Sequence, residues 1–163
     1  MPFTPFHMGP GLLLKALLQG SFSLMVFGWT QVIMDIQPLV VMLTDSGHLH
    51  GFTHTFVGAT LIGVACALTG KYAAEFGMRF IGEARYLPIS WPVATVSAFI
   101  GSYSHVLLDA VMHADLEPFA PFTLSNPFLG WLSMEALHQL CLYSGLLGVG
   151  LYFAVSRWLG RRR

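Results

Sequence analysis

Four short stretches of this chain place metal-ligand side chains inside or beside apolar segments. They are Asp35, the run from His50 to His54, the run from Ser104 to Asp109, and Glu135 with His138. Ionisable groups are costly inside a lipid bilayer, so they usually face a protein interior and carry function. Imidazoles and carboxylates together suit zinc, and also manganese or iron. The pattern therefore predicts a divalent metal site, with Zn²⁺ first among the candidates.

The spacing of these residues indicates what chemistry the site could perform. His105 and Asp109 are four residues apart, which puts both on one helix face, and Asp109 could bridge two metals. Together with Asp35 and His54 they could supply a hydrolytic metal that keeps an open position for water. Such a metal activates its water and polarises the scissile group, and a pair of metals suits phosphate esters. Asp35 or Glu135 could act as the general base if it is not a ligand.

The composition indicates which fold must hold such a site. Of the 163 residues, 55% are hydrophobic and only 10% are charged, whereas a soluble domain usually carries about 25% charged residues. The chain therefore reads as one integral membrane domain, residues 1–163, built as an all-α bundle of about five helices. No basic patch with interleaved aromatic residues suggests a nucleic-acid partner. Cys66 and Cys141 lie in apolar segments and are interpreted as packing residues.

Five apolar segments are expected to form the helices, at about residues 10–18, 22–35, 52–70, 91–112 and 137–159. A span of ~20 apolar residues crosses a bilayer, so the last three can each cross it. The first two are shorter and predict a helical hairpin or a kinked entry pair. Pro38 is expected to end or kink the second segment.

Basic residues predict the orientation of the bundle. All eight fall at one side of this topology, at Lys15, Lys71, Arg79, Arg85, Arg157 and Arg161–Arg163. The positive-inside rule then puts that side, and with it the C-terminus, in the cytoplasm. Every histidine lies toward the opposite, outer end. This convergence supports a site facing the outer side of the membrane more strongly than any single motif does.

Other interpretations of the same residues stay open. The His/Asp set could be an interhelical hydrogen-bond network that only holds a structural membrane protein together. It could also be a transient binding site in a metal or proton-coupled transport or sensing protein, which would need polar residues through the other half of the bundle as well. His48, and His50 taken alone, are more typical of caps or interfacial residues than of ligands.

Three motifs also resemble a known family. Met34-Asp35-Ile36, Gly51-Phe52-Thr53-His54-Thr55 and the stretch from Gly101 to Asp109 are similar to those of bacterial inner-membrane proteins of the LexA-induced metal-dependent hydrolase type. The opening Met-Pro-Phe-Thr-Pro with His7 resembles an uncharacterised sister group. These proteins are grouped with the zinc-dependent phospholipase C and P1 nuclease superfamily. The resemblance implies an all-helical, metal-dependent hydrolase of phosphoesters, plausibly of phospholipids in the surrounding bilayer.

The resemblance also implies ligands at particular positions. Its metal ligands correspond here to His7, Asp35, His54, His105 and Asp109, with His113 and His138 as later and looser matches. The chain departs from the family pattern at three places near these ligands. Leu49-His50 stands where the family carries His-Arg before the glycine, so the arginine is lost. Gln37 replaces a second aspartate, and Leu142 stands where the soluble enzymes carry a carboxylate, for which Glu135 could substitute.

Overall fold

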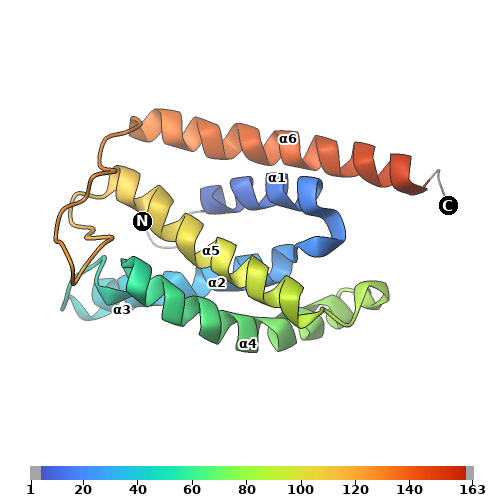
Figure 1. Ribbon diagram of the computed structural model, residues 1–163, viewed down its shortest axis with the longest axis horizontal. Helices are drawn as coiled ribbons and strands as arrows, with labels where there is room; N and C mark the ends of the chain where they lie inside the picture. Colours follow the sequence, from blue (N-terminus) through green and yellow to red (C-terminus); the bar gives the residue numbers. More distant parts are fainter. Residues whose placement is uncertain (1–4, 161–163) are drawn as a thin grey trace.

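The computed structural model describes residues 5–160, and this part of the chain is all-helical, with 75% helix and no strand (Figure 1). The predicted all-α class is therefore confirmed. The α-helices are α1 (Met8–Leu18), α2 (Leu24–Met34), α3 (Ile36–Thr44), α4 (Phe56–Phe80), α5 (Trp91–Met112) and α6 (Met134–Gly160). Short 3-10 helices precede or connect them at Pro5–His7, Gln19–Ser21, Phe52–His54 and Ala84–Tyr86.

Helices α2 and α3 form one rod with a break at Asp35. The Asp35 N–H donates to the Gln31 carbonyl at 3.3 Å, and the Asp35 carbonyl accepts from the Leu39 N–H at 3.0 Å, so helical bonding continues across the break. Pro38 follows within the first turn of α3, where the missing N–H costs least. The segment that was expected to end near Asp35 therefore extends to Thr44, and the bundle still consists of about five rods.

Three stretches of the described chain are long and apolar enough to cross a membrane: Leu24–Thr44, Phe56–Phe80 and Met134–Trp158. Two of them correspond to predicted spans, and the third is the α2–α3 rod. The predicted span at residues 91–112 is α5, which is not among the three. It carries His105, Asp109 and several serines, and these polar residues face the protein interior.

Helix α4 runs ten residues past the predicted end at Gly70, because its charged residues are paired. Lys71 and Glu75 are buried and form an ion pair one turn apart. The Glu75 Oε1 atom also accepts from the Ile89 N–H at 3.0 Å, which ties the connection between α4 and α5 to the helix. Pairing offsets the cost of burying these charges and lets the helix continue to Phe80.

Helix α1 packs mainly along α6, and glycines permit the close approach. A Cβ atom on Gly9 would lie 1.9 Å from the Cys141 carbonyl oxygen, and one on Gly148 would lie 2.4 Å from the Leu13 nitrogen. Small residues at such crossings let helix backbones approach closely in membrane proteins. The predicted first arm of a hairpin with α2 is thus held chiefly by the last helix of the chain.

The two ends of the bundle differ in composition. The α1–α2 turn, the α4–α5 connection and the end of α6 lie at one end (Figure 1). The described basic residues lie in or near these elements: Lys15 in α1, Lys71 and Arg79 in α4, Arg85 in the α4–α5 connection and Arg157 in α6. The predicted cluster Arg161–Arg163 lies outside the described residues. The candidate ligands occupy the opposite end, around the α2–α3 break and the long connection between α5 and α6 (Figure 1).

Candidate metal centre

Four separate elements bring the candidate ligands together. The last two turns of α5 supply His105 and Asp109, and the α2–α3 break supplies Asp35. The 3-10 helix before α4 supplies His54, and the one before α1 supplies His7. All five are buried, with His54 and His105 fully so. The predicted placement of His7 at the ligand end, away from Arg79 and Arg157, is confirmed.

Gln31 fixes the protonation of His105. The Gln31 Nε2 atom donates to the Gly101 carbonyl at 3.0 Å, which leaves its Oε1 atom as an acceptor. That oxygen lies 2.8 Å from the Nδ1 atom of His105, so Nδ1 carries the proton and donates. The Nε2 atom of the neutral ring is then a bare lone pair. It faces the Asp35 Oδ1 atom at 3.4 Å and the Asp109 Oδ2 atom at 3.2 Å.

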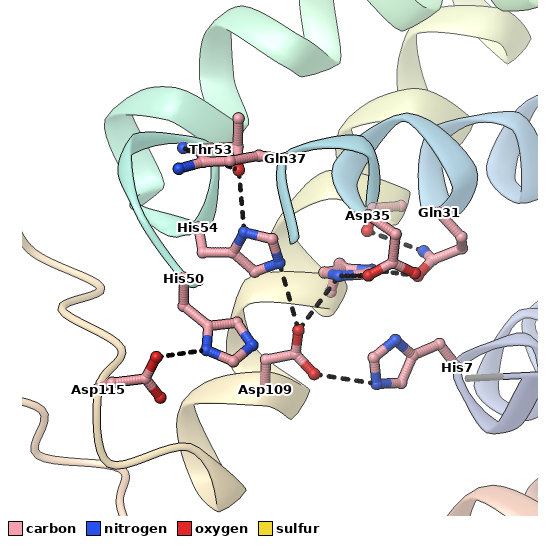
Figure 2. A network of polar contacts seen from close by, with 11 residues as sticks. His7, Gln31, Asp35, Gln37, His50, Thr53, His54, Asp109 and Asp115 are labelled. Atoms are coloured by element: carbon pink, nitrogen blue, oxygen red, sulfur yellow. Dashed lines mark hydrogen bonds and ion pairs between the residues drawn. The ribbon is translucent and has the colours of Figure 1, made fainter. Parts of the chain in front are cut away.

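A second relay fixes His54 in the same way, as Figure 2 shows. The Gln37 Nε2 atom donates to the His48 carbonyl, so its Oε1 atom accepts from the Thr53 hydroxyl at 2.6 Å. The Thr53 oxygen in turn accepts from the Nδ1 atom of His54 at 2.9 Å. The Nε2 lone pair of His54 is therefore directed to the Asp109 Oδ2 atom, 3.4 Å away. Burial lowers the pKa of His54, which keeps its ring neutral.

Asp109 is the centre of the arrangement. Its Oδ2 atom faces His54 and His105, while its Oδ1 atom lies 3.3 Å from Nε2 of His7. Both ring nitrogens of His7, and the Nε2 atoms of His54 and His105, are buried without a hydrogen-bond partner in the described structure. Buried polar atoms are normally satisfied. The three Nε2 atoms around one carboxylate need an explanation, and a cation between lone pair and carboxylate supplies it.

The distances fit this explanation. Ligand atoms about 2.0–2.1 Å from a tetrahedral zinc lie about 3.3 Å from one another, and the four His–Asp pairs here measure 3.2–3.4 Å. The candidate ligands form three groups, and within each group the ligand atoms lie within 4.8 Å of one another. They are His7, His105 and Asp109; Asp35, His54 and His105; and His50, Asp109 and His113. Because the groups share His105 and Asp109, they form one continuous cluster.

His50 extends the cluster toward the α5–α6 connection. Its Nδ1 atom donates to the Asp115 Oδ2 atom at 2.9 Å, which leaves Nε2 as the ligand atom. Its ring lies 4.1 Å, centroid to centroid, from that of His113. Although burial acts in the opposite direction, the bond from His50 holds the pKa of Asp115 below its usual value. Burial lowers the pKa of His113.

Two residues predicted for the site lie elsewhere. Glu135 is exposed at the start of α6 and accepts from Gln139 at 3.1 Å. His138 stacks on Phe6 with ring centroids 4.7 Å apart. Neither belongs to a ligand group among the described residues. The reason is that α6 packs against α1, so its first turns lie beside Phe6 and do not face α5.

The sequence prediction missed the residues that orient the histidines. Gln31 precedes Asp35 by four residues and so lies on the same face of an apolar helix, a signal that was available. Thr53 and Gln37 gave none beyond the departure of Gln37 from the family pattern. His50, which alone is typical of a cap, is buried, and its partner Asp115 comes from a loop distant in sequence.

The chain was compared with protein families, curated proteins and solved structures. No family model, no curated protein and no solved structure matches the chain.

Proposed function

We propose that the protein is a membrane-bound, metal-dependent hydrolase that acts on a phosphoester, with a phospholipid as the expected substrate. The observation that carries the proposal is the set of buried Nε2 atoms of His7, His54 and His105, which face Asp109 without hydrogen bonds. Gln31 and Thr53 hold two of these rings in the tautomer that a metal requires. A purely structural network of charge-assisted hydrogen bonds would bring each nitrogen to about 2.7–2.9 Å from the carboxylate, whereas these contacts measure 3.2–3.4 Å.

The charge of the cluster favours a phosphoester over a neutral substrate. Its buried carboxylates are Asp35 and Asp109, and the imidazoles bind metal in their neutral form. One divalent ion balances the two carboxylates, and a second leaves an excess of positive charge. A bound pair would clamp the entering and leaving oxygens of a phosphate ester and activate water. Asp109, with its oxygens directed to different histidines, is the residue placed to bridge them.

The outer surface of the helices supports a membrane location. Large apolar side chains are exposed along α4 at helical spacing, at Leu61, Val64, Leu68, Tyr72, Phe76 and Phe80. The polar ligands face inward, the reverse of a soluble bundle. Together with the one-sided basic residues, this supports an inner-membrane protein with its site toward the periplasmic face.

The alternative of a transporter requires polar groups that continue from the site toward the basic end. Two buried hydroxyls on the basic side of His105 donate within their own helices. Thr30 donates to the Val26 carbonyl at 3.0 Å, and Ser102 donates to the Phe99 carbonyl at 3.3 Å. The buried charges of that half, Lys71 and Glu75, are paired with each other. These protons and charges are engaged locally, which favours a site closed at one end over a transport pathway.

The proposal is tested with protein purified without an affinity tag. Elemental analysis should find at least about one equivalent of zinc, manganese or iron per chain. Hydrolysis of a phosphodiester or a dispersed phospholipid should disappear after chelation and return when the metal is restored. Protein that folds, contains no metal and takes up none would overturn the proposal. Metal uptake without hydrolysis of any phosphoester would favour transport or sensing.

A further inference from the structure

A cavity lies at the basic end of the bundle, opposite the metal centre. It has a volume of about 600 Å³ and lies between the ends of α2, α4, α5 and α6. Its walls are largely apolar and include Met25, Met78, Ile89, Val93 and Phe153. Small-molecule sites usually occupy about 300–1,000 Å³ and have such walls.

The packing of α6 explains why this space exists. Helix α6 is held mainly by α1, which ends at Leu18, and Figure 1 shows α6 continuing past that end. The final turns of α6, with Tyr152, Phe153 and Ser156, therefore form one wall without a helix beneath them. Phe153 is exposed. In a bilayer, a cavity behind such a helix is open sideways to lipid chains.

Two cations stand beside these apolar walls. The Lys15 ammonium donates to the carbonyls of Gln19 at 2.6 Å and Phe22 at 2.7 Å, and an ammonium has a third donor. Arg85 also lines the cavity and is paired with Glu83 at 2.9 Å. The lining thus carries two positive charges and one negative charge. The unmatched cation, Lys15, lies partly buried at the polar edge of an apolar space.

We propose that this cavity binds an anionic phospholipid of the adjacent leaflet. One acyl chain lies among Met78, Ile89 and Val93, and the phosphate accepts a hydrogen bond from Lys15. The apolar walls require a chain, and the excess positive charge requires an anionic headgroup. This lipid would occupy a site at the opposite end from the metal centre, and the proposal does not depend on hydrolysis there.

The test uses the full chain in detergent and native mass spectrometry with added phosphatidylglycerol, phosphatidylcholine or inorganic phosphate. One phosphatidylglycerol should be retained per chain, in preference to phosphatidylcholine, and inorganic phosphate should not displace it. Ser156→Phe fills the cavity and should weaken retention on the order of tenfold. Ala154→Phe adds the same ring to an exposed position of α6 outside the cavity and should leave retention unchanged.

A second pair of variants tests the charge. Lys15→Gln should weaken phosphatidylglycerol retention about fivefold, the effect of one basic residue near an anionic surface. Arg79→Gln removes a cation from the same end but not from the cavity and should have little effect. Equal retention in Ser156→Phe and Ala154→Phe would overturn the proposal, as would equal retention of the two lipids by wild type. Displacement by inorganic phosphate would indicate a phosphate site without a lipid and would overturn it as well.

Discussion

The Nε2 atom of His7 and the Oδ1 atom of Asp109 lie 3.3 Å apart, although the two residues come from opposite parts of the chain. Both are buried, and neither ring nitrogen of His7 has a hydrogen-bond partner in the described structure. A buried imidazole and carboxylate that face each other without a hydrogen bond gain little unless an ion lies between them. The metal content of the protein and of its variants is therefore the first property to measure.

Asp109→Asn separates a ligand from a scaffold residue. The change keeps the size of the side chain and removes its charge, and a neutral amide is a poor zinc ligand. We expect the variant to lose its metal and any hydrolysis, as measured by elemental analysis and activity. If Asp109 only joined helices, the cost would be about 0.6 kcal/mol, the average for a hydrogen bond in a membrane protein.

Asp45→Asn is the matched control, because Asp45 is exposed after α3 and belongs to none of the three ligand groups. It should keep metal at the wild-type level. His113→Gln should have an intermediate effect, since His113 belongs to only one of the three ligand groups. Wild-type metal content in Asp109→Asn would remove the central residue and with it most of the case for catalysis.

Thr53→Val tests the relay that orients His54. Valine has the shape of threonine but cannot pass the hydrogen bond from His54 to Gln37, so the ring is free to rotate or change tautomer. Loss of such an outer partner typically lowers metal affinity about 10–100-fold. Competition with a fluorescent chelator measures the change. Thr53→Ser should restore affinity, and Thr44→Val, in an exposed turn of α3, should not alter it.

Metal affinity should fall on the acid side. Burial lowers the pKa of His54 and of His113 below the ordinary histidine value of about 6.5, so both are neutral and ready to bind metal at pH 7. Protons compete with metal at these two rings only when the pH falls below those lowered values, so His54 and His113 should hold metal to a more acidic pH than ordinary histidines allow. A chelator titration between pH 4 and pH 8 measures this. Half-loss at or above about pH 6.5 would contradict it.

The orientation of the bundle can be measured with a single new cysteine. Ser125 lies exposed in the connection between α5 and α6, at the ligand end. Ser125→Cys should react with an impermeant thiol reagent from the periplasm, while the buried Cys66 and Cys141 stay unlabelled. A reporter fused after Arg163 should read as cytoplasmic. Labelling only after the inner membrane is broken would invert the topology and place the metal centre toward the cytoplasm.

The sequence predicted the helical class and the end at which the ligands gather, because both depend on local patterns. Apolar runs of helical length mark the rods, and the spacing of His105 and Asp109 fixes their common face. The convergence of Asp35 and His54 followed from topology alone. The positions of Glu135 and His138 did not, since they depend on which helix α6 packs against. Gly9 and Gly148 permit the packing of α6 on α1, because each lies close to the backbone of the partner helix. The periodicity of apolar residues does not reveal this close approach.

The outer partners of the histidines were also beyond a linear pattern. Asp115, in the α5–α6 connection, accepts a hydrogen bond from His50, in the α3–α4 connection. Gln37, in α3, accepts a hydrogen bond from the Thr53 N–H of the same irregular connection. Gly51 allows this, because a Cβ atom there would lie 2.2 Å from the Gln37 Nε2 atom. Such contacts depend on loop geometry, which residue types alone do not determine.

The pairing of the first helix with the last has a consequence for how the protein matures in the cell. Residues 31–113 contain every ligand of the cluster except His7, and these can assemble as soon as α5 has been synthesised. His7 waits on α1, which packs mainly against α6, a helix that is synthesised after α5. A nascent chain therefore carries the cluster without a seated His7 until α6 has been made. Completion of the cluster would then depend on the insertion and packing of α6.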